Sequence, residues 1–539
     1  MNRTVLTRAR ILDAATAELS PETTIVIEGD TIAAIGDAPA GGQAIDLGGR
    51  VVVPGFVDSH VHLGWLGASL ANVPLTDAAD LGEIQRRLVA ARAGLDEDAT
   101  MLVGKGWLFD AVDGEPTAAM IDAVVDDIPV FLNCNDMHSV WANSAALHAL
   151  GVDASTPDPA GGRIARLASG EPAGMLYERA AHEIAWDYIA RETSDDDRVV
   201  SAKRALDAFA AAGVTSVVDM GMNGADWRAL QTLAEQSGGS LPVRVSAHWL
   251  VADAGDDEGN LAQVRRAMAA RAESTEWLDV IGIKLILDGT IDACTAAMRH
   301  PYADGSNDDL LWDVDRLHRV ATDADAVQLR LAIHAIGDRA SSIALDVLER
   351  VVAENPSWDR RPRIEHLEVV ADETPARMAA LGVTASVQPV HADPAIQSNW
   401  RAVLGDDRVE RGFAWPLFSE AGALVAFGTD APTAPHEALD NLFVATTRRS
   451  ALDPSLPANH PQWSLPLDAA FRHATIDSAA SFAVDDRVGR IATGYRADLT
   501  VLDRDPAEAD GLRGNAVALT INAGRVVFTG EAADRVTAR

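Results

Sequence analysis

The chain has 539 residues and carries 80 acidic against 45 basic side chains, a formal net charge of −35. Such a charge repels nucleic acid and anionic membranes, which argues against both as partners. Only two cysteines occur, and no run of apolar residues is long enough to span a bilayer. We therefore expect a cytoplasmic protein without a disulfide framework, a membrane segment or an export signal.

Short β-like segments occupy both ends of the chain. Runs such as "TTIVIEGDTIAAIGD" fall within residues 1–54, and "NAVALTINAGRVVFTG" falls within residues 486–539. Neither end has enough strands to bury a core by itself. We predict that the two ends combine in one small β-sandwich domain beside a central domain of residues 55–485.

In the central part, apolar strand-like runs alternate with helix-like stretches, which is typical of a parallel sheet. Eight strands are expected, the number that closes a (β/α)8 TIM barrel. They lie at 56–62, 214–219, 243–249, 281–287, 330–334, 363–367, 383–388 and 423–429. The long gap after the first strand, roughly 66–212, indicates an insertion over the barrel mouth. Alternatively, the run at 129–134 is itself a barrel strand.

The first expected barrel strand, "VVVPGFVDSHVHL", carries His60 and His62. Side chains at positions i and i+2 of a strand point to the same face, so the two imidazoles project side by side. Neutral imidazole is a common metal ligand, and this spacing suits chelation of one ion. The alternative is that these are two ordinary histidines at a strand end that bind no metal. Further metal ligands elsewhere in the chain would exclude this alternative.

Further polar residues fall at the carboxyl ends of other expected strands, where a barrel places its chemistry. They are Lys284 in "IGIKLILDG", His334 in "LRLAIHAIGDRA", His366 in "PRIEHLEVV" and Asp430 in "ALVAFGTDAP". Each of them alone could be structural. Together with the two histidines of the first strand, they predict a metal centre at the barrel mouth.

Lys284 is the most informative of these residues. The chain has three lysines against 42 arginines, and burial of an unpaired ammonium lowers its pKa toward the free amine. A free amine can add carbon dioxide to form a carbamate, an anion that bridges two metal ions, whereas arginine stays protonated. The alternative is an ordinary pair of Lys284 with Asp288 or another carboxylate.

This order of residues resembles the amidohydrolase superfamily. The amino-acid sequences of the motifs resemble those of its amidohydrolase family 3 branch, which includes N-substituted formamide deformylases. The matching motifs are "PGFVDSHVHL", "NDMHSVWANSAAL", "GEPAGML", "IKLILDGTIDACTAAM", "IHAIGDRA", "IEHLEVV", "SVQPVHADP" and "FGTDAP". Together with both terminal β segments, the resemblance extends over nearly the whole chain. The sequence departs from the family pattern at Asp292 to Cys294 and at Leu167, positions on the substrate side.

The resemblance implies a hydrolase of non-peptide carbon–nitrogen bonds that uses two divalent ions, zinc or another metal. The implied ligands are His60, His62 and Asp430 for one ion and His334 and His366 for the other, bridged by carboxylated Lys284 and a hydroxide. Asp430 would take the proton of the attacking water and deliver it to the leaving nitrogen.

The remaining site residues concern the substrate, which we expect to be a small N-formyl or N-acyl amine. Candidates for a hydrogen bond to the developing oxyanion are His138 and His391, and candidates for substrate contacts are Trp107, Asp288, Gln388 and Asp393. A cyclic amide, carbamate or ester is an alternative substrate, and a regulatory protein without turnover is an alternative function. Deamination fits less well, because deaminases of this superfamily generally use one metal ion and lack the lysine. By analogy with similar barrels, we expect a homodimer.

Overall fold

The computed structural model describes residues 3–36, 41–95, 99–134, 138–159, 162–397, 399–508, 511–531 and 537–538. The chain folds into two compact units. The larger unit comprises residues 1–66 and 202–539, and the smaller one comprises residues 67–201. Each unit has its own sheets and its own hydrophobic cores.

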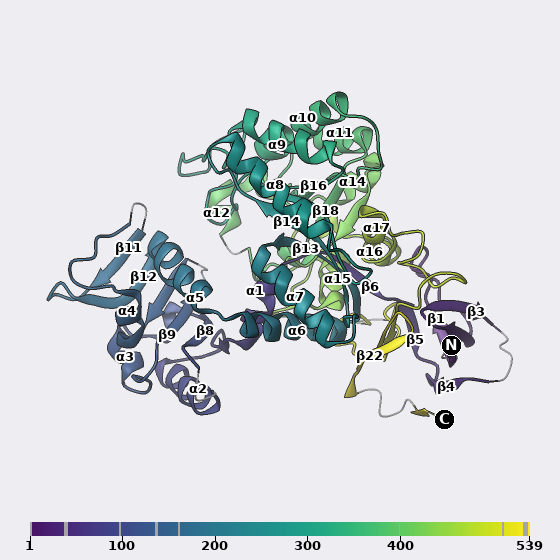
Figure 1. Cartoon of the computed structure of the whole chain (residues 1–539), viewed down its shortest axis with the longest axis horizontal. Coiled ribbons are helices and arrows are strands. Elements are labelled where there is room, and N and C mark those ends of the chain that lie inside the picture. The colour runs from purple at the N-terminus through teal and green to yellow at the C-terminus, as the bar shows by residue number, and fades with distance from the viewer. Residues whose placement is uncertain are drawn as a thin grey trace. The chain divides into compact units, whose positions relative to one another are not determined.

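Eight parallel strands form the central sheet of the larger unit, in the order β6-β13-β14-β15-β16-β17-β18-β19 (Figure 1). Their bounds are β6 (Phe56–Val61), β13 (Val214–Met222), β14 (Arg244–Val251), β15 (Leu278–Ile286), β16 (Arg330–Ala335), β17 (Arg363–His366), β18 (Thr384–Val387) and β19 (Val425–Phe427). Every strand expected from the sequence is present, with ends shifted by a few residues. The strand order follows the chain order, as in a (β/α)8 barrel.

The barrel is nearly closed between β6 and the segment that follows β19. Thr429 donates from its backbone N–H and its Oγ1 to the two carboxylate oxygens of Asp58, at 3.0 and 2.6 Å. The N–H of Asp430 donates to the carbonyl of His60 at 2.7 Å. A Cβ on Gly428 would lie 2.5 Å from the Cβ of His60, so glycine is required for this approach. These contacts bring the polar ends of the first and last strands together.

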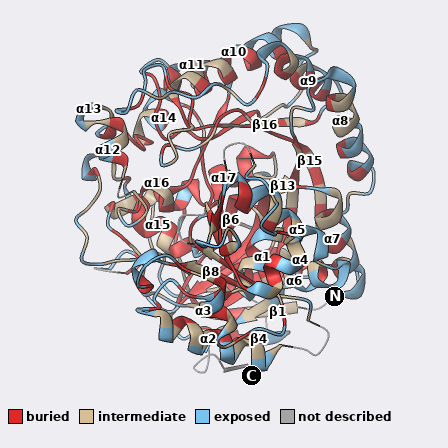
Figure 2. Cartoon of the chain, turned by 90° about the vertical axis from the view of Figure 1, so that its left-hand side faces the viewer, coloured by how far each residue is buried: buried red, intermediate tan, exposed pale blue. Residues whose placement is uncertain are grey.

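Helices follow the barrel strands, and several begin at a side-chain cap. Asn223, Asp256 and Asp313 accept backbone N–H groups at the starts of α7, α8 and α9, so part of the acidic excess stabilises helix ends. The helices of this unit include α7 (Gly224–Gln236), α8 (Asp257–Arg271), α9 (Val314–Ala326), α10 (Asp338–Glu354), α11 (Thr374–Leu381), α14 (Pro416–Ala421), α15 (Ala438–Thr447), α16 (Leu467–His473) and α17 (Ile476–Ser481). Figure 2 shows their exposed outer faces and the buried strands within. Among the described residues, no helix is both long and apolar enough to cross a membrane.

Strands from both chain ends pair in one sheet. β5 (Val51–Pro54) lies between β1 (Arg3–Ile11), to which it is parallel, and β20 (Leu499–Leu502), to which it is antiparallel. The other strands are β2 (Thr23–Glu28), β3 (Thr31–Ile35), β4 (Gln43–Asp46), β21 (Val517–Asn522), β22 (Arg525–Thr529) and β23 (Thr537–Ala538). One hydrophobic core combines side chains of both ends, including Leu6 and Ile521. That this region is a β-sandwich with limits at residues 54 and 486 stays a prediction.

The smaller unit contains a six-stranded sheet of order β11-β12-β10-β9-β8-β7. Its strands are β7 (Val73–Pro74), β8 (Leu102–Trp107), β9 (Val130–Cys134), β10 (Ser139–Ala142), β11 (Gly162–Arg166) and β12 (Pro172–Glu178). Its helices include α2 (Leu81–Gly94), α3 (Ala118–Asp122), α4 (Ser144–Leu150) and α5 (Asp187–Glu192), the last preceded by a π-helix at Ala181–Trp186. Because β9 belongs to this sheet, the alternative that residues 129–134 form a barrel strand is wrong. That this insertion covers the barrel mouth stays a prediction.

Candidate metal centre

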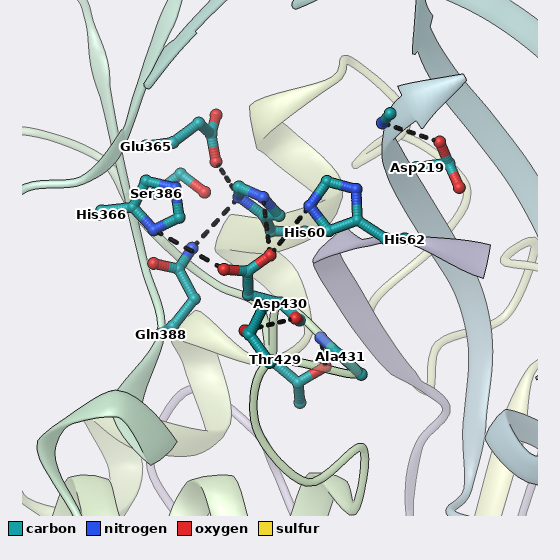
Figure 3. Close-up of polar contacts among 12 residues, drawn as sticks. His60, His62, Asp219, Glu365, His366, Ser386, Gln388, Thr429, Asp430 and Ala431 are labelled. Carbon is teal, nitrogen blue, oxygen red and sulfur yellow. Dashed lines mark hydrogen bonds and ion pairs between the residues drawn. The ribbon is translucent and has the colours of Figure 1, made fainter. Parts of the chain in front are cut away.

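Three of the predicted ligands surround the carboxylate of Asp430 (Figure 3). Its Oδ1 lies 3.0 Å from Nε2 of His62 and 3.2 Å from Nε2 of His60. Its Oδ2 lies 4.0 Å from Nδ1 of His366. These residues stand at or just beyond the carboxyl ends of β6, β17 and β19, so the parallel strands deliver them to the same end of the barrel.

Two of these residues have a left-handed backbone, with φ of 76° at His366 and 58° at Asp430. Such a conformation costs about 1–3 kcal/mol for a residue other than glycine and is concentrated at functional sites. At His366 this backbone conformation interrupts the alternation of side chains between the two faces of β17. As a result, the ring of His366 lies 4.9 Å from the ring of His60, which the neighbouring Glu365 also contacts.

Several buried polar atoms in this cluster have no hydrogen bond within the described part of the chain. They are Nε2 of His60, Nδ1 of His366, Nζ of Lys284 and Oδ1 of Asp430. Leaving a buried polar atom unpaired costs about 1–3 kcal/mol, more for a charged group, so four in one place require an explanation. Donor atoms of His60, His366 and Asp430 all lie within 4.8 Å of one another and could hold a metal ion. Imidazole and carboxylate donors of this kind fit a divalent ion such as zinc.

Lys284 is buried in β15, and only 1% of its surface is exposed. Burial lowers the pKa of its ammonium to about 8, although the carboxylates of Glu365 and Asp430 act in the opposite direction. Asp288 does not pair with it: the two carboxylate oxygens of Asp288 accept backbone N–H groups of residues 297, 336 and 337. Burial thus shifts the amine of Lys284 toward the neutral form that carbamate formation requires.

His334, on β16, completes the predicted ligand set. Its ring lies 4.4 Å from the ring of His366. Its Nε2 lies 3.4 Å from Oδ1 of Asp288 and 3.3 Å from the carbonyl oxygen of Gly289. Five of the six predicted ligands are therefore linked by short distances, and the sixth, Lys284, interacts electrostatically with Asp430 and His60. The division of the ligands between two ions stays a prediction.

Burial and charge set the protonation of the ligands. Burial lowers the pKa of His60 and His366, which favours the neutral imidazole that binds a metal. Burial opposes ionisation of Asp430, but His60 and His62 outweigh it and hold the pKa of this carboxyl well below its ordinary value. Burial thus favours neutral imidazoles at His60 and His366, and the neighbouring histidines favour an ionised carboxylate at Asp430.

His391 lies beside the centre, in the 3-10 helix Pro389–Ala392 that follows β18. Its Nε2 is 3.7 Å from Oδ2 of Asp430 and 3.2 Å from Oγ1 of Thr433, and its Nδ1 is 3.3 Å from Oε1 of Glu368. Burial favours the neutral ring, but the carboxylates of Glu368 and Asp430 raise its pKa. A protonated His391 is a suitable hydrogen-bond donor. His366, Glu368 and His391 form a second group of potential metal ligands.

The predicted substrate residues of the barrel have different surroundings. Nε2 of Gln388 lies 3.3 Å from Nδ1 of His60, next to the cluster. Asp393 accepts the N–H groups of Ala395 and Ala451 at 2.9 and 2.8 Å. Asp288, as described above, also accepts backbone N–H groups. Asp288 and Asp393 therefore organise loops, and their substrate contacts stay predictions.

His138 and Trp107 belong to the smaller unit. Nδ1 of His138 is 3.0 Å from Oε2 of Glu178, and both side chains are largely exposed. Trp107 is fully buried in a hydrophobic core, where its Nε1 donates to the carbonyl of Leu132 at 3.0 Å. Trp107 is therefore a residue of the hydrophobic core. The roles of both residues toward a substrate stay predictions.

Sequence reasoning missed two residues that contact the centre through His60. Glu365 lies 2.7 Å from Nδ1 of His60, and Arg363 pairs with Glu365 at 2.6 Å. The available signal was their position: two charged residues at alternate places in the short strand that ends at His366. A buried strand rarely carries charges unless they are paired.

The profile of the amidohydrolase family matches residues 43–528. Protein LONG AFTER FAR-RED 3 of Arabidopsis thaliana is 32% identical over 480 residues, 87% of this chain and 80% of that protein. N-substituted formamide deformylase of Arthrobacter pascens is 28% identical over 508 residues, 90% of this chain and 89% of that protein. The crystal structure of an uncharacterized metal-dependent hydrolase of Pyrococcus horikoshii superposes with a TM-score of 0.78 at 26% identity, covering 95% of this chain and 99% of that one.

Proposed function

The chain belongs to the amidohydrolase family, and from that membership we propose that it hydrolyses the non-peptide C–N bond of a small N-formyl or N-acyl amine. The observation that carries the proposal is the group of buried atoms on His60, Lys284, His366 and Asp430 that have no hydrogen bond to any described residue. The similarity to a formamide deformylase supports the choice of substrate class.

The ligands would divide between two ions, with zinc as the expected metal. His60, His62 and Asp430 would hold one ion and His334 and His366 the other, with Lys284 bridging them as a carbamate. Bound ions supply polarisation of the substrate carbonyl and activation of water.

The two oxygens of Asp430 face different groups, which suggests different tasks. Oδ1 faces His60 and His62 and would serve as the ligand atom. Oδ2 faces His391 and would accept the proton of the attacking water. As the water oxygen bonds to the carbonyl carbon and the C–N bond breaks, that proton passes to the leaving nitrogen. The products are formic acid, or another carboxylic acid, and an amine, and the acid then loses its proton at neutral pH.

His391 would stabilise the carbonyl oxygen during attack. Its Nε2 lies within 4 Å of Asp430, and Glu368 holds its Nδ1. A donor aimed at an oxygen that gains charge in the transition state contributes about 100- to 1,000-fold in rate.

The test is release of amine from a panel of N-formyl and N-acyl amines, with a cyclic amide, a carbamate and an ester for comparison. We expect the metal-loaded protein to hydrolyse members of the first group, and Asp430→Asn to be at least about 1,000-fold slower because the proton acceptor is lost. Turnover restricted to the comparison compounds would assign the alternative substrate class. Absence of turnover on every compound by protein with full metal content would refute the proposal.

A further inference from the structure

Arg363 and Glu365 form a buried ion pair on β17. Their side chains are 1% and 0% exposed. Nε of Arg363 donates to Oε1 of Glu365 at 2.6 Å, and Nη2 donates to Oε2 at 3.2 Å. The two bonds form the bidentate arrangement that fixes a guanidinium and a carboxylate in one plane.

The carboxylate of Glu365 also contacts His60 (Figure 3). Its Oε2 lies 2.7 Å from Nδ1 of the imidazole. An ionised carboxylate only accepts hydrogen bonds, so the proton of a neutral His60 must be on Nδ1. The lone pair is then on Nε2, the atom that faces Asp430 at 3.2 Å.

Gln388 is the competing neighbour, since its amide Nε2 lies 3.3 Å from the same Nδ1. A nitrogen that donates to Glu365 cannot also accept from Gln388. The shorter contact to an ionised group is the stronger one, so Glu365 decides the tautomer. With its oxygen and nitrogen exchanged, the amide of Gln388 would accept from Nδ1 instead of competing with it.

The remaining donors of Arg363 hold the surrounding strands. Nη2 donates to the carbonyl oxygen of Ser59 at 2.7 Å and to Oγ of Ser386, and Nη1 donates to Oγ of Ser481 at 3.3 Å. Ser59 precedes His60 on β6, whereas Ser386 lies on β18. One guanidinium therefore ties the strand that carries His60 to the strand that carries Glu365.

Stability alone is a weak reason for such a pair. Replacement of a buried ion pair by apolar residues of similar volume is often neutral or stabilising. A carboxylate that accepts the N–H of a metal-bound histidine, however, orients the ring and raises metal affinity. The location of this pair behind His60 fits the second role.

We propose that Arg363 and Glu365 are positioning residues that fix the tautomer and orientation of His60 so that its Nε2 binds metal. The inference rests on the metal-dependent function proposed above. It predicts that loss of the carboxylate weakens metal binding by about 10- to 100-fold, the range found for such outer partners.

The experiment measures zinc affinity of the full-length protein by competition with a chromophoric chelator, with urea unfolding in parallel. We expect Glu365→Gln to bind zinc about 10- to 100-fold more weakly. The control is Asp325→Asn, which breaks the pair of Asp325 with Arg360 (2.8 Å, side chains 2% and 10% exposed) outside the metal centre. This control is expected to lose stability and keep wild-type affinity.

The double variant Arg363→Met/Glu365→Gln separates positioning from stability, because it leaves no unpaired charge. It also carries the test if Glu365→Gln alone fails to fold. We expect its stability to approach that of the wild type while its zinc affinity stays low. Wild-type affinity in the folded double variant would overturn the inference and leave the proposed function intact. Failure of the wild-type protein to bind any metal would instead refute the proposed function.

Discussion

Gly221 offers a test of the geometry around His62. A Cβ at this position on β13 would lie 2.7 Å from Nδ1 of His62, and ordinary contact begins near 3.4 Å. Gly221→Ala therefore has to move the imidazole by about 0.7 Å. Nε2 of the same ring lies 3.0 Å from Oδ1 of Asp430, and the ring of Trp65 lies 5.2 Å from it at an interplanar angle of 34°. The displacement is thus expected to misplace a ligand.

We expect Gly221→Ala to lower kcat/KM by about 10- to 100-fold, since a shift near 1 Å at a catalytic group costs up to about 100-fold. Overpacking should also lower the free energy of unfolding by about 1–3 kcal/mol. The assays are amine release, zinc competition and urea unfolding. Gly224→Ala is the matched control, because its Cβ would meet no atom closer than 3.5 Å. Equal activity and zinc affinity in the Gly221 and Gly224 variants, both folded, would refute the placement of His62.

Three further predictions concern the bridge, the metal and the acid response. The Lys284→Arg variant cannot form a carbamate and should bind at most about one ion instead of two. Plasma mass spectrometry of the purified variant measures its metal content. Retention of two ions would contradict a carbamate bridge at Lys284. Removal of metal with a chelator should abolish activity and lower Tm, because an ion that binds only the folded state stabilises it. Addition of zinc with bicarbonate should restore both the activity and the Tm. Recovery with zinc in carbonate-free buffer would argue against a carbamate. Arg316 holds the pKa of Asp253 at about 2, below its ordinary value of 3.8, so the ionised carboxylate stabilises the fold above about pH 4 and this contribution disappears as pH falls toward 2. Asp253→Asn should therefore be less stable than wild type at pH 7 in urea unfolding, and the difference should shrink at pH 3; a constant difference would contradict the pairing.

Most of the barrel could be predicted from local pattern. Each strand is a short apolar run bounded by turns, and the alternation with helices dictates a parallel sheet. The eight strands therefore appear near their expected places. The assignment of strand β9 was ambiguous because buried strands of both sheets have the same apolar sequence pattern. Its pairing with β8 and β10, and not its own residues, assigns it to the smaller unit.

The candidate metal ligands could also be selected from the sequence, because unusual residues at strand ends are visible there. His60, Lys284 and Asp430 stand out in apolar surroundings, and parallel strands bring such ends together. The family resemblance drawn from these motifs is confirmed by the profile match over residues 43–528. Asp288 and Asp393 show the limit of this approach, since nothing in the sequence reveals that their oxygens are occupied by backbone N–H groups.

The sequence by itself determined which chemical groups are present, how they alternate along each strand, and that those strands form a barrel. Only the tertiary structure decided which side chains meet. His60 and Glu365 are 305 positions apart, and only the folded barrel brings β6 and β17 close enough for this contact. Local patterns reflect the periodicity of neighbouring residues, whereas pairing, burial and protonation depend on atoms that distant segments supply.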